Sequence, residues 1–95
     1  MTMDHLDIIC SKSRLQILHE LSRRDMYVSE IIDRVGMDGK NCKHHLNVLE
    51  RAGIIVSRQE GRRRYYSLVK GIRLIISPEP KRRYELQFID KKGDK

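Results

Sequence analysis

The sequence predicts a mainly helical α+β fold, with helices in the first half of the chain and two β-hairpins in the second. Apolar residues recur at helical spacing as far as Ala52. From Ile54 onward they come in β-branched or alternating runs bounded by turn residues. The chain has 95 residues, of which 39% are hydrophobic and 35% are charged. This length and composition are typical of one small folded domain.

The composition excludes several classes of protein. The longest apolar runs, such as residues 54–56, span three residues, whereas a membrane helix needs about 20. We therefore expect no membrane association. Two cysteines are too few for a disulfide scaffold and favour a reducing, cytoplasmic setting. The sequence contains no nucleophile–base motif, paired-carboxylate motif or phosphate-binding loop, so we predict that it is not an enzyme.

The excess positive charge is unevenly distributed along the chain. The formal net charge is +7, with a sequence pI of about 9.7. Residues 1–37 carry a net charge of −1, whereas residues 38–66 and 67–95 each carry +4. This asymmetry predicts an anionic partner on one face, with nucleic acid favoured over a membrane surface.

Two helices are expected before residue 25. Leu6, Ile9 and Cys10 have the spacing of a short amphipathic helix within residues 3–10, and Cys10 is expected to be a small buried residue. The hydroxyls of residues 11–13 suit the N-cap of a second helix that runs to about Arg24. Its predicted apolar stripe consists of Leu15, Ile17, Leu18 and Leu21. Residues 25–27 are expected to form a connection.

Two further helices are expected on either side of a tight turn. The first contains Val28, Ile31, Ile32 and Val35 at helical spacing, and Gly36 suits its left-handed C-cap. Asp38 is the natural N-cap of the next helix, which ends at Gly53. The predicted buried stripe of this helix is Cys42, His45, Leu46, Leu49 and Ala52.

The remaining chain predicts two hairpins. A strand begins at Ile54, turns at Glu60-Gly61, and returns over residues 64–69. Its tip carries Arg62, Arg63 and Arg64. Alternating apolar residues predict an extra C-terminal hairpin over about residues 72–89, and a helix beginning at Pro80 is the open alternative. Residues 90–95 are expected to be a flexible tail.

Two helices joined by a tight turn and followed by a basic hairpin predict a winged helix-turn-helix in a single domain, residues 1–89. The motif occupies about residues 28–53 and the wing about 54–69. A recognition helix enters the major groove with the side opposite its buried stripe. The residues expected on that side are Lys40, Asn41, Lys43, His44 and Asn47. The wing arginines are expected on the DNA backbone or in the minor groove.

Four stretches at matching spacing resemble the ArsR-type winged helix-turn-helix transcriptional regulators. Residues 11–18 resemble the opening helix of that family, 28–37 its first motif helix, 43–55 its recognition helix and exit, and 61–68 its wing. The resemblance implies binding to double-stranded DNA. Metal sensors of the family carry ligands in the first motif helix or on a C-terminal helix. Residues 26–32 and 71–89 contain neither Cys nor His.

We therefore predict a DNA-binding transcriptional regulator with no metal and no cofactor. Cys42 and His45 share one helix face as half a metal site, but four ligands are normally needed. A homodimer is expected, because two half-sites supply specific affinity. Its interface would use apolar residues outside the motif: Leu6, Ile9, Tyr84, Leu86 and Phe88. A protein-docking module and a nonspecific, chromatin-like DNA-binding protein are the alternatives.

Overall fold

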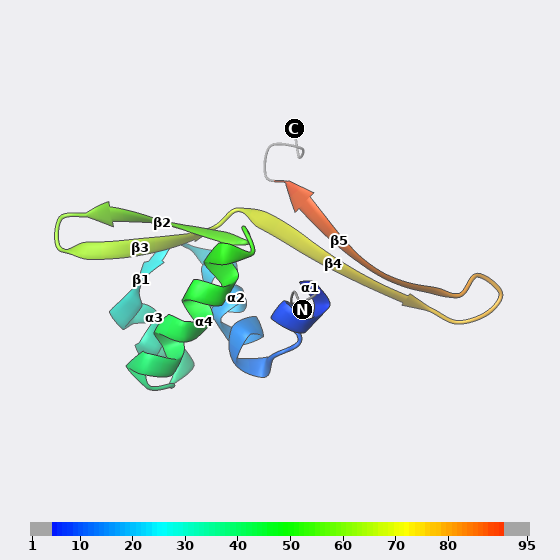
Figure 1. Cartoon of the computed structure of the whole chain (residues 1–95), viewed down its shortest axis with the longest axis horizontal. Helices are drawn as coiled ribbons and strands as arrows, with labels where there is room; N and C mark the ends of the chain where they lie inside the picture. The colour runs from blue at the N-terminus through cyan, green and yellow to red at the C-terminus, as the bar shows by residue number, and fades with distance from the viewer. Residues whose placement is uncertain (1–4, 91–95) are drawn as a thin grey trace.

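The computed structural model describes residues 5–90. Over these residues, helices and one short strand are followed by two β-hairpins (Figure 1). The helical half consists of α1 (His5–Ile9), α2 (Lys12–Arg23), β1 (Met26–Tyr27), α3 (Val28–Val35) and α4 (Gly39–Arg51). The hairpins consist of β2 (Ile55–Glu60) with β3 (Arg63–Leu68), and β4 (Lys70–Ser77) with β5 (Arg83–Asp90). The predicted α+β winged helix-turn-helix is confirmed.

The predicted helix ends explain how the motif is positioned. Ser11 Oγ accepts a hydrogen bond of 3.3 Å from the backbone N–H of Arg14 at the start of α2. Gly36 has φ +79° and its N–H donates to the Ile32 carbonyl at 2.8 Å, which closes α3. Asp38 occupies the N-cap position of α4, although its side chain makes no capping hydrogen bond. The turn between α3 and α4 therefore follows from local sequence.

The core lies where α2, α3 and α4 pack on the inner face of the wing. Its fully buried side chains come from each of these elements and from β1. They are Ile17, Met26, Ile31, Cys42, Leu46, Leu49, Ile54 and Ile55. Burial of apolar side chains on this scale is the main stabilising contribution in a domain of this size, and it holds α4 with its polar side outward.

The expected connection over residues 25–27 is wrong for its last two residues. Met26 and Tyr27 form β1, which pairs antiparallel with Tyr66 and Tyr65 of β3. The three-stranded sheet has the order β1-β3-β2. A two-residue strand has too little sequence to show a period, and its partner lies about 40 residues away. The pairing attaches the start of α3 directly to the wing.

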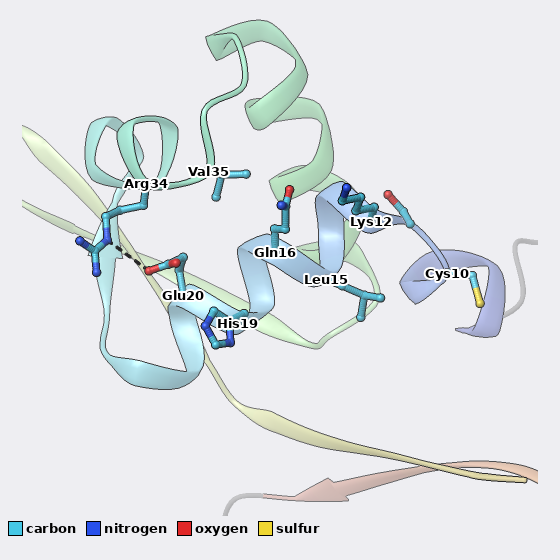
Figure 2. Close-up of a pocket in the computed structure, with 9 residues that line it drawn as sticks. Cys10, Lys12, Leu15, Gln16, His19, Glu20, Arg34 and Val35 are labelled. Atoms are coloured by element: carbon cyan, nitrogen blue, oxygen red, sulfur yellow. Dashed lines mark hydrogen bonds and ion pairs between the residues drawn. The ribbon is translucent and has the colours of Figure 1, made fainter.

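Two residues predicted to be buried are exposed. Leu15 is 51% exposed on α2, and Cys10 is exposed after α1. Both line a shallow cavity of about 530 Å³ beside α2 and α3, where Arg34 Nε and Glu20 Oε1 form an ion pair at 3.3 Å (Figure 2). Helical spacing places a residue on a face, but a neighbouring element must cover that face for the residue to be buried.

The extra C-terminal hairpin is confirmed, and the alternative helix from Pro80 is wrong. Strands β4 and β5 pair antiparallel from Lys70–Asp90 to Ser77–Arg83. Asp90 belongs to β5 rather than to the predicted tail, and residues 91–95 lie outside the described residues. The wing and this second hairpin project in opposite directions along the longest axis of the molecule (Figure 1). Within residues 5–90, no helix has both the length and the apolar character needed to cross a membrane.

Candidate nucleic-acid interface

The polar side of α4 carries five of the predicted DNA-binding residues, and all five are exposed: Lys40, Asn41, Lys43, His44 and Asn47. The opposite side is held in the core by Cys42, Leu46 and Leu49, which are 0% exposed. Because the helix is fixed by its apolar stripe, its polar side presents a rigid set of hydrogen-bond donors to solvent. A helix presented in this way has the dimensions that a DNA major groove accommodates.

A groove joins α4 to the wing. It has a volume of about 560 Å³, and Lys43 and Asn47 line it together with Arg62, Arg63 and Arg64. The other lining residues are Tyr27, Val28, Ser29, Ile32, Gly39 and Tyr66, so no lining side chain is acidic. The fold thus brings together residues that lie about 20 positions apart in sequence. Lys40, Asn41 and His44 lie on α4 outside this groove.

Arg63 is held by an aromatic pair at the junction of α3 and the wing. Its guanidinium lies 4.3 Å from the ring centroid of Tyr27. Tyr27 in turn meets Tyr65 edge-to-face, with the ring centroids 5.5 Å apart. A side-chain hydrogen bond with Tyr65, followed by the Coulombic effect of Tyr27, raises the pKa of Arg63. The guanidinium therefore stays charged and is positioned by cation–π contact.

Arg64 is linked to α4 through one hydroxyl group. Its Nη1 donates to Ser57 Oγ at 2.9 Å, and Ser57 Oγ donates to Glu50 Oε2 at 2.8 Å. Glu50 belongs to α4, whereas Ser57 and Arg64 belong to the two strands of the wing. This chain of hydrogen bonds fixes the wing relative to α4.

Arg58 differs from the other wing arginines because carboxylates neutralise it. Its Nη1 lies 2.9 Å from Asp25 Oδ2, and its Nε lies 2.6 Å from Glu60 Oε2. Hydrogen bonds to Glu60 and then to Asp25 raise the pKa of Arg58. We therefore assign Arg58 to the internal structure of the wing.

Arg62 lies in the turn at the wing tip, whereas Arg63 and Arg64 belong to β3, so the predicted three-residue tip contains only the first of them.

The sequence interpretation missed Tyr27 and Ser57. For Tyr27 the sequence holds a partial signal in Glu30, because a Glu at the third position of a helix often accepts from the N–H of the residue before the helix. In the structure, Glu30 Oε1 accepts from the Tyr27 N–H at 3.2 Å.

His45 and Cys42, the half metal site suggested by sequence, each lie in surroundings that disfavour metal binding. His45 Nδ1 accepts a hydrogen bond of 3.1 Å from Arg14 Nε. Burial, and then the charge of Asp38, raises the pKa of the Cys42 thiol, which disfavours the thiolate that a metal needs. Between residues 5 and 90, no three His, Cys, Asp or Glu side chains are grouped so that they could hold a metal ion.

Comparison with known proteins agrees with this geometry. The family model of the bacterial regulatory proteins of the arsR family matches residues 11–57. The uncharacterised HTH-type transcriptional regulator Rv0081 of Mycobacterium tuberculosis is 37% identical over 57 residues, which cover 59% of this chain and 50% of that protein. The chain spans about half to two thirds of the length of the curated relatives it matches.

Solved structures show the same fold. HlyU from Vibrio cholerae N16961 has a TM-score of 0.64 and 30% identity, and the likeness covers 67% of this chain and 70% of HlyU. The homodimeric winged helix-turn-helix DNA-binding domain Mb0332 from Mycobacterium bovis has a TM-score of 0.62 and 31% identity, covering 64% and 56% of the two chains. The chain therefore belongs to the ArsR family of winged helix-turn-helix regulatory proteins.

Proposed function

We propose that this protein is a transcriptional regulator that binds double-stranded DNA with α4 in the major groove and the wing on the adjacent backbone. The observation that carries the proposal is the groove between them, which gathers Lys43, Asn47 and three arginines and has no acidic lining residue. Phosphate contacts from such side chains supply affinity and orientation, whereas base contacts supply sequence preference.

The residues divide between these two roles. Asn41 can pair bidentately with adenine and Lys43 can donate to guanine acceptors. Lys40, His44 and Asn47 surround them on the same polar side of α4. Arg62, Arg63 and Arg64 contact phosphates or enter the minor groove. This division separates a sequence-specific regulator from a chromatin-like protein, which would use phosphate contacts alone.

We propose that the protein acts as a homodimer in the cytoplasm, without enzymatic activity and without a metal cofactor. The homodimeric state of the Mb0332 domain supports the proposed homodimer. Two copies present two recognition helices, and half-sites about 34–36 Å apart then fall on one face of the duplex. Of the residues expected at the dimer interface, Ile9 is 5% exposed within a single chain and belongs to its core.

The experiment is selection of bound duplexes from a random library, followed by competition of the selected duplex against bulk DNA. Enrichment of one sequence, with binding at least tenfold tighter than to bulk DNA, supports a specific regulator. Equal binding to both supports the nonspecific alternative. Absence of binding at low salt contradicts DNA binding and supports the protein-docking alternative.

A further inference from the structure

One side of α2 forms the floor of a cavity that lies away from the candidate DNA interface. Lys12, Leu15, Gln16, His19 and Glu20 recur at steps of one, three or four residues, so they share one side of the helix. The residues just before α2 and the end of α3 complete the lining, and the volume is about 530 Å³ (Figure 2). Of the described residues that line it, none belongs to α4 or to the wing. We call this space the α2 cavity.

The α2 cavity has the size and the lining of a small-molecule site. Its volume falls within the range of about 300–1,000 Å³ that is usual for ligand pockets, which are mainly apolar with a few polar groups. Leu15 is 51% exposed on the floor, and Val35 lines the side formed by α3. A single exposed leucine is common on protein surfaces, but this one lies in a hollow. We therefore expect the apolar part of a ligand to lie along Leu15 and Val35.

The charged residues of the α2 cavity favour an anion. Lys12 and Arg34 are cationic, and Glu20 is the one acid among the described lining residues. Two cations and one acid give a formal charge of +1 when His19 is neutral. Glu20 is already held by Arg34, whose Nε lies 3.3 Å from Glu20 Oε1. Within residues 5–90, no carboxylate pairs with the Lys12 ammonium, so the excess positive charge is located on Lys12.

The positions of these charges set the shape of the ligand. Lys12 lies near one end of the exposed side of α2, and the Arg34–Glu20 pair lies at the other end (Figure 2). Lys12 and Glu20 are separated by about 12 Å along the helix, from the usual rise per residue. A ligand with its negative charge at Lys12 therefore extends over Leu15 toward a closed ion pair, which offers no free charge to a second ionised group. One anionic head and a medium-length aliphatic tail match this arrangement.

We propose that the α2 cavity binds an amphipathic monocarboxylate of the fatty-acid class, with its carboxylate on Lys12 and its aliphatic tail over Leu15 and Val35. A charge-assisted hydrogen bond to the ammonium orients the head, and removal of the tail from water contributes affinity. The α2 cavity shares no lining residue with the groove between α4 and the wing. The inference is therefore independent of the proposed DNA-binding function, and its test contains no DNA.

Calorimetric titration of the full chain with decanoate, kept below its micelle concentration, measures binding directly. Decanol and decylammonium are the matched probes, because they keep the tail and carry a neutral or a cationic head. We expect decanoate to bind at least about tenfold tighter than either probe, as a hydrogen bond to a charged group predicts. Lys12→Met should remove this preference, whereas Lys12→Arg should retain it. Lys81→Met, which removes an exposed charge from the second hairpin, should change nothing.

Two further measurements locate the ligand. Leu15→Asn should weaken decanoate binding, whereas Leu74→Asn should leave it unchanged, although Leu74 on the second hairpin is 47% exposed and Leu15 is 51% exposed. Cys10 is an independent reporter, because it is exposed and lines the α2 cavity. Decanoate should slow the alkylation of Cys10 by iodoacetamide, and decylammonium at the same concentration should not.

The comparison of the three probes on the unaltered protein decides the proposal even if a variant fails to fold, which circular dichroism establishes. Absence of decanoate binding overturns it. Equal binding of decanoate and decanol overturns it as well, because the site then recognises the tail alone. Tighter binding of decylammonium contradicts the assignment of the head to Lys12 and transfers it to Glu20. Loss of binding on Leu74→Asn overturns the location, because the ligand then lies on the second hairpin.

Discussion

Arg14 Nε donates a hydrogen bond of 3.1 Å to His45 Nδ1, joining α2 to α4. The same guanidinium donates through Nη1 to the Ile8 carbonyl of α1 at 2.9 Å. One side chain therefore links the N-terminal helix, the second helix and α4. Because His45 accepts only when Nδ1 is unprotonated, this link depends on the protonation state of a histidine.

The first prediction follows from the titration of His45. Burial, then the charge of Arg14, and then that of His44 lower the pKa of His45 below its ordinary value of 6.5. As the pH falls through 6.5, the unfolded chain therefore binds a proton that the folded chain resists. The free energy of unfolding should fall with decreasing pH from 6.5 down to the folded pKa, as measured by urea unfolding between pH 8 and 5.

His45→Asn is the test variant, because an amide oxygen can accept from Arg14 without titrating in this range. Its stability should vary less with pH than that of the wild type. His19→Asn is the matched control, since His19 is exposed on α2 and is not among the groups that lower the pKa of His45, and it should retain the wild-type dependence. Equal pH profiles for all three proteins would show that the Arg14–His45 link does not govern stability.

The second prediction contrasts two leucines that helical spacing treats alike. Leu46 is 0% exposed in the core, whereas Leu15 is 51% exposed. Leu46→Ala should lower the free energy of unfolding by about 2–5 kcal/mol, because it removes buried surface and leaves a cavity. Leu15→Ala should change it by less than about 0.5 kcal/mol. Urea unfolding of both variants measures this, and equal losses would mean that Leu15 is covered in solution.

The third prediction concerns base recognition. Asn41→Ala should weaken binding to the selected duplex by about 1–3 kcal/mol and relax the preference at one base position, because a bidentate contact is lost. Binding to a scrambled duplex should stay unchanged. Gln16→Ala removes an exposed amide from α2 and serves as the control. Equal weakening on both duplexes would assign Asn41 to the phosphate backbone.

The fourth prediction concerns metals. Stoichiometric zinc should leave the affinity for the selected duplex unchanged, because Cys42 is buried with a raised thiol pKa and His45 is engaged by Arg14. Fluorescence anisotropy with and without zinc measures this. A tenfold loss of affinity, equivalent to about 1.4 kcal/mol, that Cys42→Ser abolishes would reveal a metal site on α4.

Local signals in the sequence were sufficient for the helices and for the wing, whereas for the second hairpin they left a helix beginning at Pro80 as an open alternative. Gly36 and Asp38 mark the turn because a left-handed residue and an N-cap each have a local chemical requirement. The contacts that position the arginines could not be predicted in the same way. Tyr27 meets Tyr65 only after β1 has paired with β3, and Ser57 joins Glu50 to Arg64 only after β2 has paired with β3.

Burial was predicted less well than secondary structure. Periodicity placed Leu15 on the same stripe as Ile17 and Leu18, but the elements that cover the latter two leave Leu15 exposed. Similarly, the alternation of residues over β4 and β5 predicts that the second hairpin has two faces. How much of the apolar face packs on the core depends instead on where the second hairpin leaves the domain. Both are properties of packing between distant elements.

The most direct test of the DNA interface is a salt series on two double variants that lose the same charge. Arg62→Ala with Arg64→Ala alters the wing, whereas Lys81→Ala with Arg82→Ala alters the second hairpin. Each lost phosphate contact lowers the slope of log K against log salt by about one. The wing variant should therefore reduce the magnitude of this slope by about two per protomer, or by about four as a dimer. The second-hairpin variant should keep the wild-type slope. Equal slopes for both variants would contradict the assignment of the wing to DNA.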